Sequence, residues 1–196
     1  MSISIRCPWA VRSGMEAEYH DKEWGVPRYD DIGQFEFLTL EAAQSGLAWL
    51  TILRKRKGYH QAFAGFSPEK VARYSNEDVS RLMTDSGIVR NRKKIESAVN
   101  NARCFMEVAA RHGSFSNYIW SFVDGKPVVN HRQRMEEVPP LTLLSITIAK
   151  ELKALGFKYL GPTVIYAHMQ ATGLVNDHLV SCSRHEECCK LAEKAA

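Results

Sequence analysis

The sequence contains no long apolar run, and none of its stretches approaches the roughly 20 apolar residues needed to span a bilayer. Residues 1–6 lack the apolar core of a secretory signal peptide. The sequence also has no internal repeat, no low-complexity segment and no series of alternating polar and apolar runs typical of strands. These absences predict a cytoplasmic protein with an all-α fold and no membrane partner.

Cysteine is sparse, with five residues in 196. They are Cys7, Cys104, Cys182, Cys188 and Cys189. An odd number argues against a framework of paired disulfides, and a chain of this length does not need disulfides to stabilise its core. We therefore expect a reducing compartment, with some thiols free and others bound to metal.

Neither sign of charge is in large excess, since 26 Lys and Arg against 22 Asp and Glu leave a net charge of +4. The basic residues gather in two short runs, at 54–57 and 90–94. Such a run is usually a solvated surface, so each gives only a hint of a polyanionic partner. With 45% hydrophobic residues, the chain is predicted to form one globular domain over residues 1–196, with two helical lobes.

Apolar periodicity and end signals predict a succession of helices. They cover residues 14–20, 32–45, 48–64, 76–85, 90–111, 114–123, 143–155 and 162–172, with a short helix opened by Ser67 and Pro68. Gly156 and Gly173 are placed to end the last two. The polar segment 184–196 is predicted to be a flexible tail.

Histidine and cysteine residues near both termini form a candidate metal site. His178 and Cys182 are four residues apart, a spacing that puts both side chains on one face of a helix. With Cys7 and His20 they have the composition of a closed, structural Cys2His2 zinc site, which would pin the two ends of the chain together. The alternative is ordinary buried cysteines and surface histidines. Rival ligands are His185 and Cys188.

Residues 85–95 predict a helix end, a tight turn at Gly87 and Ile88, and the start of a basic helix. The basic residues there are Arg90, Arg92, Lys93 and Lys94. Backbone N–H groups at a helix start attract phosphate, and these charges would strengthen the attraction without reading the base sequence. The pattern therefore favours a contact with the DNA backbone, although it also fits a plain helical corner with a solvated first turn.

Two segments carry side chains suited to a flat ligand. Tyr19 and Trp24 lie in one short segment and could stack on a ring, although that segment also fits a surface turn. In the other segment, Glu41 could accept hydrogen bonds from an amino-bearing base while Trp49 stacks on it. Periodicity alone instead favours a Trp49 in the core and an exposed Glu41.

Several blocks of this sequence resemble the 3-methyladenine DNA glycosylase I family. The blocks are Cys7 with Trp9, residues 19–27, residues 40–49, Gly87 with Ile88, residues 120–122, and residues 173–178 with Cys182. They match in register from about Cys7 to Cys182, which is nearly the whole chain. Several blocks in one order are far more specific than any single motif.

This resemblance implies an all-α helix-hairpin-helix fold whose N- and C-terminal segments are joined by one structural zinc ion. It also implies an enzyme that excises 3-methyladenine from alkylated DNA by hydrolysing the N-glycosidic bond. By position, the zinc ligands fall on Cys7, His20, His178 and Cys182. The base-pocket residues fall on Tyr19, Trp24, Trp49 and Glu41, with Glu41 as the catalytic candidate.

The same resemblance implies how the protein meets DNA. A DNA-interrogating loop falls near Gly46 and Leu47. The candidate hairpin contacts are Gly87, Ile88, Arg90, Arg92 and Lys93. We expect a monomer that binds double-stranded DNA containing alkylated adenine and releases free 3-methyladenine. The alternatives are a zinc-containing DNA-binding relative without catalysis and, less favoured because it leaves the basic hairpin unused, a small-molecule enzyme.

The chain departs from the family pattern at Glu16. Better-known members carry a second pocket tyrosine at this position, three residues before the one matched by Tyr19. A carboxylate here would either favour a cationic base or point to solvent. No lysine is placed for Schiff-base chemistry, and we find no counterpart of the catalytic aspartate that other helix-hairpin-helix glycosylases use.

Overall fold

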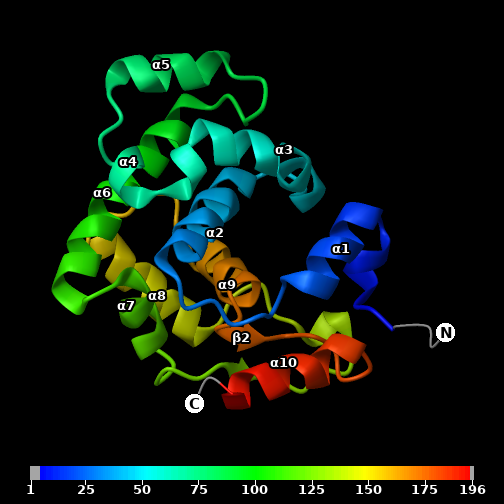
Figure 1. Cartoon of the computed structure of the whole chain (residues 1–196). Coiled ribbons are helices and arrows are strands. Elements are labelled where there is room, and N and C mark those ends of the chain that lie inside the picture. The colour runs from blue at the N-terminus through cyan, green and yellow to red at the C-terminus, as the bar shows by residue number, and fades with distance from the viewer. Residues whose placement is uncertain (1–4, 195–196) are drawn as a thin grey trace.

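The computed structural model describes residues 5–194 of the chain. Its elements are η1 (Pro8–Val11), α1 (Gly14–Lys22), α2 (Asp31–Gln44), α3 (Trp49–Ala62), η2 (Ala64–Phe66), α4 (Pro68–Val71), α5 (Asn76–Thr84), α6 (Arg92–His112), α7 (Phe115–Ser121), β1 (Val128–Val129), η3 (Met135–Glu137), α8 (Leu143–Ala154), α9 (Pro162–Ala171), β2 (Val175–Asn176) and α10 (Ser183–Lys194). Figure 1 shows α2 near the centre of these helices. Within the described part of the chain, no helix is both long and apolar enough to cross a membrane.

Short-range signals set the helix starts. The side chain of Ser13 caps α1 and that of Asp30 caps α2, each by accepting a backbone N–H of the first turn. Ser75 and Asp78 form a reciprocal capping box at the start of α5. The helices predicted from the sequence are confirmed, with ends displaced by a few residues at most.

One short pair of strands is the exception to the all-α prediction. β1 and β2 run parallel, with Val128 opposite Val175, and the Val128 N–H donates to the Leu174 carbonyl over 2.9 Å. Each strand has two residues, which is too short for an alternating pattern to appear in the sequence. The pair joins the segment after α7 to the segment that leads into α10.

Helix α2 forms the centre of the main hydrophobic core. Its Phe35, Leu38 and Leu40 side chains are buried, and the helix packs against α3, α6, α7 and α9. A helix surrounded in this way is buried on nearly every face, so its polar side chains are buried as well. This is why Glu41, near the end of α2, lies inside the protein.

The predicted flexible tail is wrong for the residues that the structure describes. Residues from Ser183 onward form α10, which packs against β2. His185 and Cys188, three residues apart on one face, are both buried, and Nε2 of His185 lies 2.9 Å from the Asn130 carbonyl oxygen. The helix is stabilised by contacts with segments distant in sequence, and its polar composition alone gives no sign of them. Residues 195–196 of the predicted tail lie outside the described residues.

A close contact between two glycines places the turn before α6. A Cβ atom at Gly58 of α3 would lie 2.3 Å from the carbonyl oxygen of Gly87. Only a residue without a side chain allows the two backbones to approach so closely. The Lys55 ammonium adds a hydrogen bond of 2.6 Å to the carbonyl oxygen of Ser86. The hairpin of α5 and α6 is therefore held against α3.

Candidate active site and metal centre

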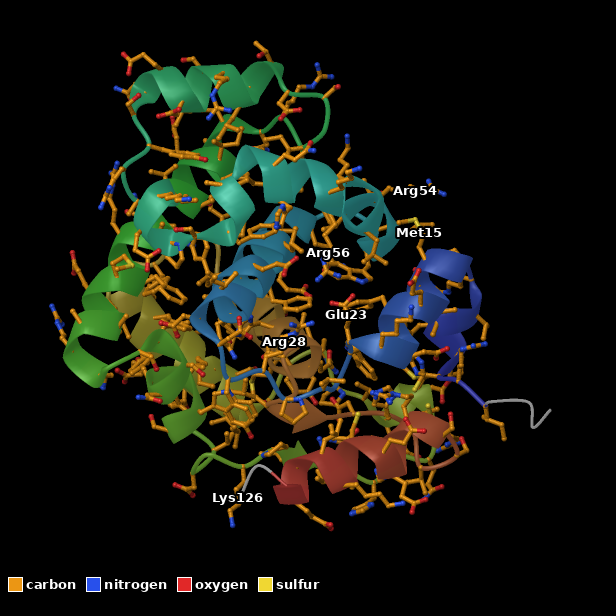
Figure 2. All side chains as sticks on the ribbon, viewed as in Figure 1. Met15, Glu23, Arg28, Arg54, Arg56 and Lys126 are labelled. Atoms are coloured by element: carbon orange, nitrogen blue, oxygen red, sulfur yellow. The ribbon has the colours of Figure 1, made fainter. Side chains whose placement is uncertain are left out.

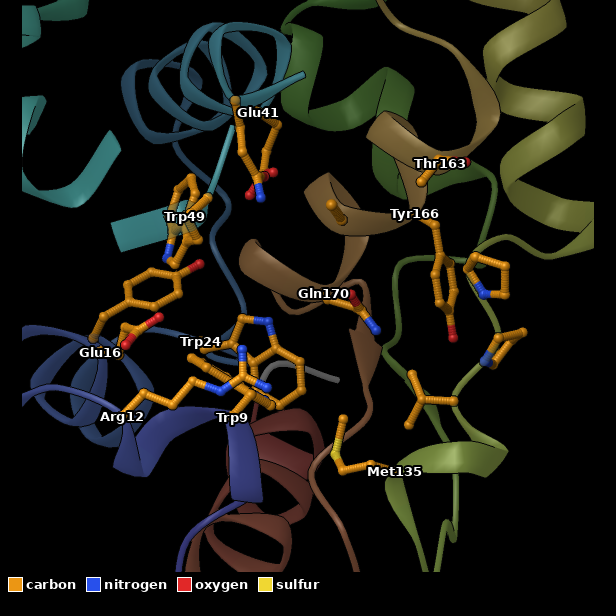
Figure 3. A pocket seen from close by; sticks show the side chains of 17 residues that line it. Trp9, Arg12, Glu16, Trp24, Glu41, Trp49, Met135, Thr163, Tyr166 and Gln170 are labelled. Atoms are coloured by element: carbon orange, nitrogen blue, oxygen red, sulfur yellow. The ribbon is translucent and has the colours of Figure 1, made fainter. Parts of the chain in front are cut away.

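A cavity of about 480 Å³ lies between α1, the α2–α3 junction, α9 and the segment after η3. Figure 3 shows side chains from all of these elements around it. The lining residues are Trp9, Arg12, Glu16, Tyr19, Trp24, Glu41, Gln44, Ala48, Trp49, Met135, Val138, Pro139, Pro140, Thr163, Tyr166, Ala167 and Gln170. All four residues predicted to form a base pocket are among them, so the structure brings these residues together.

Glu41 is a buried carboxyl group without a protein partner. It is 5% exposed, and no side chain or backbone N–H of the described residues donates a hydrogen bond to it. Desolvation by burial raises its pKa to about 8. An unpaired polar group at a cavity wall is suited to a polar or cationic ligand, because that ligand can supply the missing partner. The periodicity-based alternative of an exposed Glu41 is wrong.

Aromatic rings form the wall around this carboxyl group. The ring centroids of Tyr19 and Trp49 are 5.2 Å apart, and those of Trp9 and Trp24 are 5.1 Å apart. The Trp49 indole N–H is buried and has no hydrogen-bond partner among the described residues. Burial, then the nearby charge of Glu41, raises the pKa of Tyr19 well above its usual value, so its hydroxyl stays protonated. The cavity thus offers flat apolar faces and uncharged donors near one carboxyl group.

An ion-pair network supports the aromatic wall from behind. The Arg56 guanidinium binds Glu23 through two hydrogen bonds of 2.7 and 2.8 Å and also donates to Glu36 over 2.7 Å. Arg28 and Arg56 each place their guanidinium carbon 5.4 Å from the centroid of the Phe37 ring. Figure 2 shows Glu23, Arg28 and Arg56 between α1 and α3. Arg56 is therefore engaged within the protein, unlike the solvated surface suggested for the basic run 54–57.

The four predicted metal ligands lie together in a separate buried cluster. Their ligand atoms, from Cys7, His20, His178 and Cys182, all lie within 4.8 Å of one another. The Cys182 sulfur is 3.5 Å from Nε2 of His20 and 3.6 Å from Nδ1 of His178, and the Cys7 sulfur is 3.8 Å from the same His178 atom. Zinc bonds of about 2.3 Å to sulfur and about 2.0 Å to nitrogen place tetrahedral ligands about 3.6 Å apart. The donor set therefore fits a tetrahedral ion.

Hydrogen bonds orient both histidines of this cluster. Nδ1 of His20 lies 2.8 Å from a carboxylate oxygen of Asp21, which leaves Nε2 directed at Cys182. Nε2 of His178 lies 2.9 Å from the Trp24 carbonyl oxygen, which leaves Nδ1 for the cysteines. Partners of this kind fix the ring orientation of metal-bound histidine.

His178 and Cys182 reach the cluster differently from the prediction. They lie in the segment between β2 and α10 and are not part of one helix. A turn with a 2.8 Å hydrogen bond from the Cys182 N–H to the Leu179 carbonyl brings them together instead. The rival ligands His185 and Cys188 are not in the cluster.

The predicted DNA-contacting residues differ in exposure. Arg90, Arg92 and Lys93 are exposed at the turn between α5 and α6. Ile88 is buried, at 1% exposed, so its side chain anchors the turn and is not available for contact. Gly87 is half-buried against α3.

Helix α6 is connected to the mouth of the cavity through Lys94. Its ammonium donates hydrogen bonds of 2.7 and 2.6 Å to the carbonyl oxygens of Ala43 and Ser45 at the end of α2. Gly46 and Leu47 follow directly, and the Leu47 side chain is 39% exposed. The predicted interrogating loop therefore lies beside residues that line the cavity.

The α9 side of the cavity was not among the predicted site residues. Thr163, Tyr166 and Gln170 all line it, at the spacing of one helix face. Behind them the fully buried Asp177 accepts hydrogen bonds from the Tyr166 hydroxyl and, over 2.8 Å, from the Gln170 amide. Polar residues on one face of the otherwise apolar α9 were the sequence signal that could have indicated this side of the cavity. Thr163 also places the α8–α9 turn at the cavity, so the chain has a second helical hairpin in addition to that of α5 and α6.

The methyladenine glycosylase family model matches residues 9–185 of this chain. The chain belongs to the methyladenine glycosylase family. Its sequence is 44% identical over 177 residues to DNA-3-methyladenine glycosylase 1 of Escherichia coli strain K12, an alignment that covers 90% of this chain and 95% of that relative. The family resemblance in the sequence is therefore confirmed.

Solved structures of the family share the fold. A crystal structure of 3-methyladenine DNA glycosylase I has a TM-score of 0.89 at 42% identity, and it covers 91% of this chain and 98% of the other. A second structure, of a tyrosine-to-phenylalanine variant of 3-methyladenine DNA glycosylase I in complex with 3-methyladenine, has a TM-score of 0.88 at 38% identity. It covers 91% of this chain and 96% of the other.

Proposed function

We propose that this chain is a monofunctional DNA glycosylase that excises 3-methyladenine from alkylated DNA in base excision repair. The observation that carries the proposal is the unpaired, buried Glu41 in a cavity walled by Tyr19, Trp24 and Trp49. A relative with the same fold is described in complex with 3-methyladenine. The cavity, about 480 Å³, has room for a purine base with part of its sugar.

The reaction follows from the charge of the damaged base. Methylation at N3 makes the adenine of the nucleotide cationic, so the bond between N9 and the sugar carbon C1′ breaks with its electron pair leaving on the base. The base departs neutral without being protonated. Water adds at C1′ and gives up a proton, which leaves a hydroxylated sugar. Because the leaving group needs no activation, the enzyme chiefly has to extract the base from the stack, hold it and admit water.

Each pocket residue has a role in that scheme. Aromatic faces of Tyr19, Trp24 and Trp49 favour a cationic ring over neutral adenine. Glu41 accepts hydrogen bonds from the amino edge of the base and loses its proton when the cation binds. Positive charge then moves from the base towards the sugar as the bond breaks, and an ionised Glu41 stabilises that charge. Glu41 is thus both the recognition residue and the catalytic candidate.

We also propose that Cys7, His20, His178 and Cys182 bind one structural zinc ion. The support is their burial, the tetrahedral spacing of the donor atoms and the two orienting hydrogen bonds on the histidine rings. The ion would supply no step of the reaction. It would hold the segment before α1 against the segment before α10, next to Trp24.

The DNA surface is proposed to include the loop at Gly46 and Leu47 and the α5–α6 turn. Exposed Arg90, Arg92 and Lys93 would bind phosphates there. The α8–α9 turn is a second candidate for the helix-hairpin-helix element, because Thr163 in the first turn of α9 lines the cavity. A duplex that delivers a base to the cavity passes close to this turn.

The test is release of free base from methylated duplex DNA by the purified protein. We expect chromatography to detect 3-methyladenine among the released bases, with the DNA backbone left uncut until alkali is added. Glu41→Gln should slow release, while Glu107→Gln on the exposed surface of α6 should not. Tight binding to abasic DNA without any base release would contradict the proposal and favour a non-catalytic DNA-binding protein.

A further inference from the structure

The cavity contains a second carboxylate, from Glu16, in addition to Glu41. Glu16 is 8% exposed, and its carboxylate accepts a 2.9 Å hydrogen bond from the Ser13 hydroxyl. The same hydroxyl accepts the Glu16 backbone N–H over 3.2 Å. Figure 3 shows Glu16 on the same side of the cavity as Arg12. The surface-pointing alternative for Glu16 is therefore wrong.

The two carboxyl groups lie in opposite electrostatic environments. Glu16 is in the first turn of α1, where unpaired N–H groups and the helix dipole stabilise negative charge. Glu41 is in the last turn of α2, where the dipole opposes negative charge, and it has no protein donor. Burial raises the pKa of Glu41 to about 8, so the empty site holds it largely protonated at neutral pH. Of the two groups, Glu16 is the one at a helix start with a hydroxyl donor beside it.

No cation of the described residues neutralises Glu16 through an ion pair. Arg12 lines the same cavity, but its side chain is exposed and makes no ion pair with Glu16. Arg56, between α1 and α3, is paired with Glu23 and Glu36. The negative charge of Glu16 therefore remains available to a ligand.

We propose that Glu16 is a specificity-determining residue that selects bases carrying a positive charge over uncharged bases of the same shape. This inference rests on the proposed function, since it concerns the same cavity. The charge is on the base before the bond breaks and leaves it as the bond breaks. Glu16 therefore stabilises the bound substrate at least as much as the transition state, so its loss should raise KM without lowering kcat.

The experiment compares a cation with its neutral isostere. The probes are 3,9-dimethyladeninium and 3-deaza-3,9-dimethyladenine, in which carbon replaces the methylated ring nitrogen. Trp9, Trp24 and Trp49 line the cavity, so quenching of tryptophan fluorescence reports binding of either probe. Glu16→Gln removes the charge and keeps the size. Glu18→Gln is the matched control, because Glu18 lies on the same helix with a 65% exposed side chain and does not line the cavity.

We expect Glu16→Gln to weaken binding of the cation about tenfold and binding of the neutral isostere less than twofold. Glu18→Gln should change neither. With methylated DNA, Glu16→Gln should raise KM with kcat within about twofold of the wild type. An equal loss for both probes, or no loss for either, would overturn the inference. If Glu16→Gln loses affinity for the cation alone and the wild-type protein releases no base, the proposed function is contradicted while the selectivity of Glu16 stands.

Discussion

The Nε2 atom of His178 lies 2.9 Å from the carbonyl oxygen of Trp24. The indole of Trp24 lines the cavity, so one residue serves the base pocket with its side chain and the metal cluster with its backbone. A Cβ atom at the next residue, Gly25, would lie 2.9 Å from the His178 ring, and Gly25 also has a φ of +77°. His178 therefore packs closely against Trp24 and Gly25, and a change at the metal cluster should alter the position of Trp24 in the pocket.

Loss of a metal ligand should therefore destabilise the protein and weaken base binding together. We expect wild-type protein to contain about one zinc ion per chain and Cys182→Ala to contain none. Removal of the ion should lower Tm by about 10 °C, because the ion would join the segment before α1 to the segment before α10. Metal analysis and calorimetry provide the measurement. Cys104→Ala is the control, since Cys104 lies on α6 outside the cluster. Equal metal content in both variants would rule out this ligand set.

The buried Glu41 should make stability depend on pH. Its pKa is raised from the usual 4.5 to about 8, so the folded protein holds this proton more tightly than the unfolded chain does. The stabilisation is complete below about pH 4.5 and is lost as the pH rises towards 8. We expect Glu41→Gln to match the wild type near pH 4.5 and to be more stable than it by about 4 kcal/mol near pH 8.

Unfolding in urea across this pH range measures the difference. Glu18→Gln serves as the control, because hydrogen bonding to Lys22 lowers the pKa of Glu18 and its removal gives no gain at high pH. A Glu41→Gln effect of the same size at both ends of the range would show that the carboxyl group is not desolvated. The same variant should bind the damaged base less well. Glu41 therefore lowers the free energy of unfolding at high pH while it contributes to base binding.

Short-range features of the fold could be predicted, because their causes lie within a few residues. The Ser75–Asp78 capping box is complete in the sequence, and the structure has it. Burial of Glu41 could not be predicted from nearby residues, because it depends on residues of α1 and α9 that surround the end of α2. The spacing of His178 and Cys182 fits a helix equally well, yet a turn produces it here.

Arg56 shows why a run of basic residues is an uncertain signal. Arg54 and Arg56 are neighbours in the same run, but Arg54 is exposed and Arg56 is paired with Glu23, 33 residues earlier in the chain. Which residue of the run turns inward depends on where α1 lies relative to α3. Only the tertiary structure contains that information, and Figure 2 shows the difference between the two arginines.

Replacement of Arg56, which does not line the cavity, should therefore lower stability and weaken base binding indirectly. Arg56→Met keeps the length of the side chain but leaves Glu36 without its arginine and Glu23 with Arg28 alone. We expect the free energy of unfolding to fall by about 2 kcal/mol, a loss moderated by partial exposure of the network. Binding of 3-methyladenine should weaken several-fold, because Tyr19 and Trp24 lose the support of α3. Arg54→Met should change neither quantity, and equal effects from the two variants would remove the network from this role.

The exposed basic residues of the α5–α6 turn should contribute to DNA binding through charge alone. Arg92 and Lys93 are both exposed, and Arg92 has only a long ion pair of 3.5 Å with Glu96. If each binds one phosphate, the double replacement by alanine reduces the slope of log K against log salt concentration by about 2. The loss should be the same for methylated and unmethylated duplexes, because phosphate contacts carry no information about the base. Fluorescence anisotropy over a range of salt concentrations measures both slopes, with replacement of Arg103 and Arg111, further along α6, as the control. An unchanged slope would place the DNA elsewhere, and the same titration on Lys158→Ala would then test the α8–α9 turn.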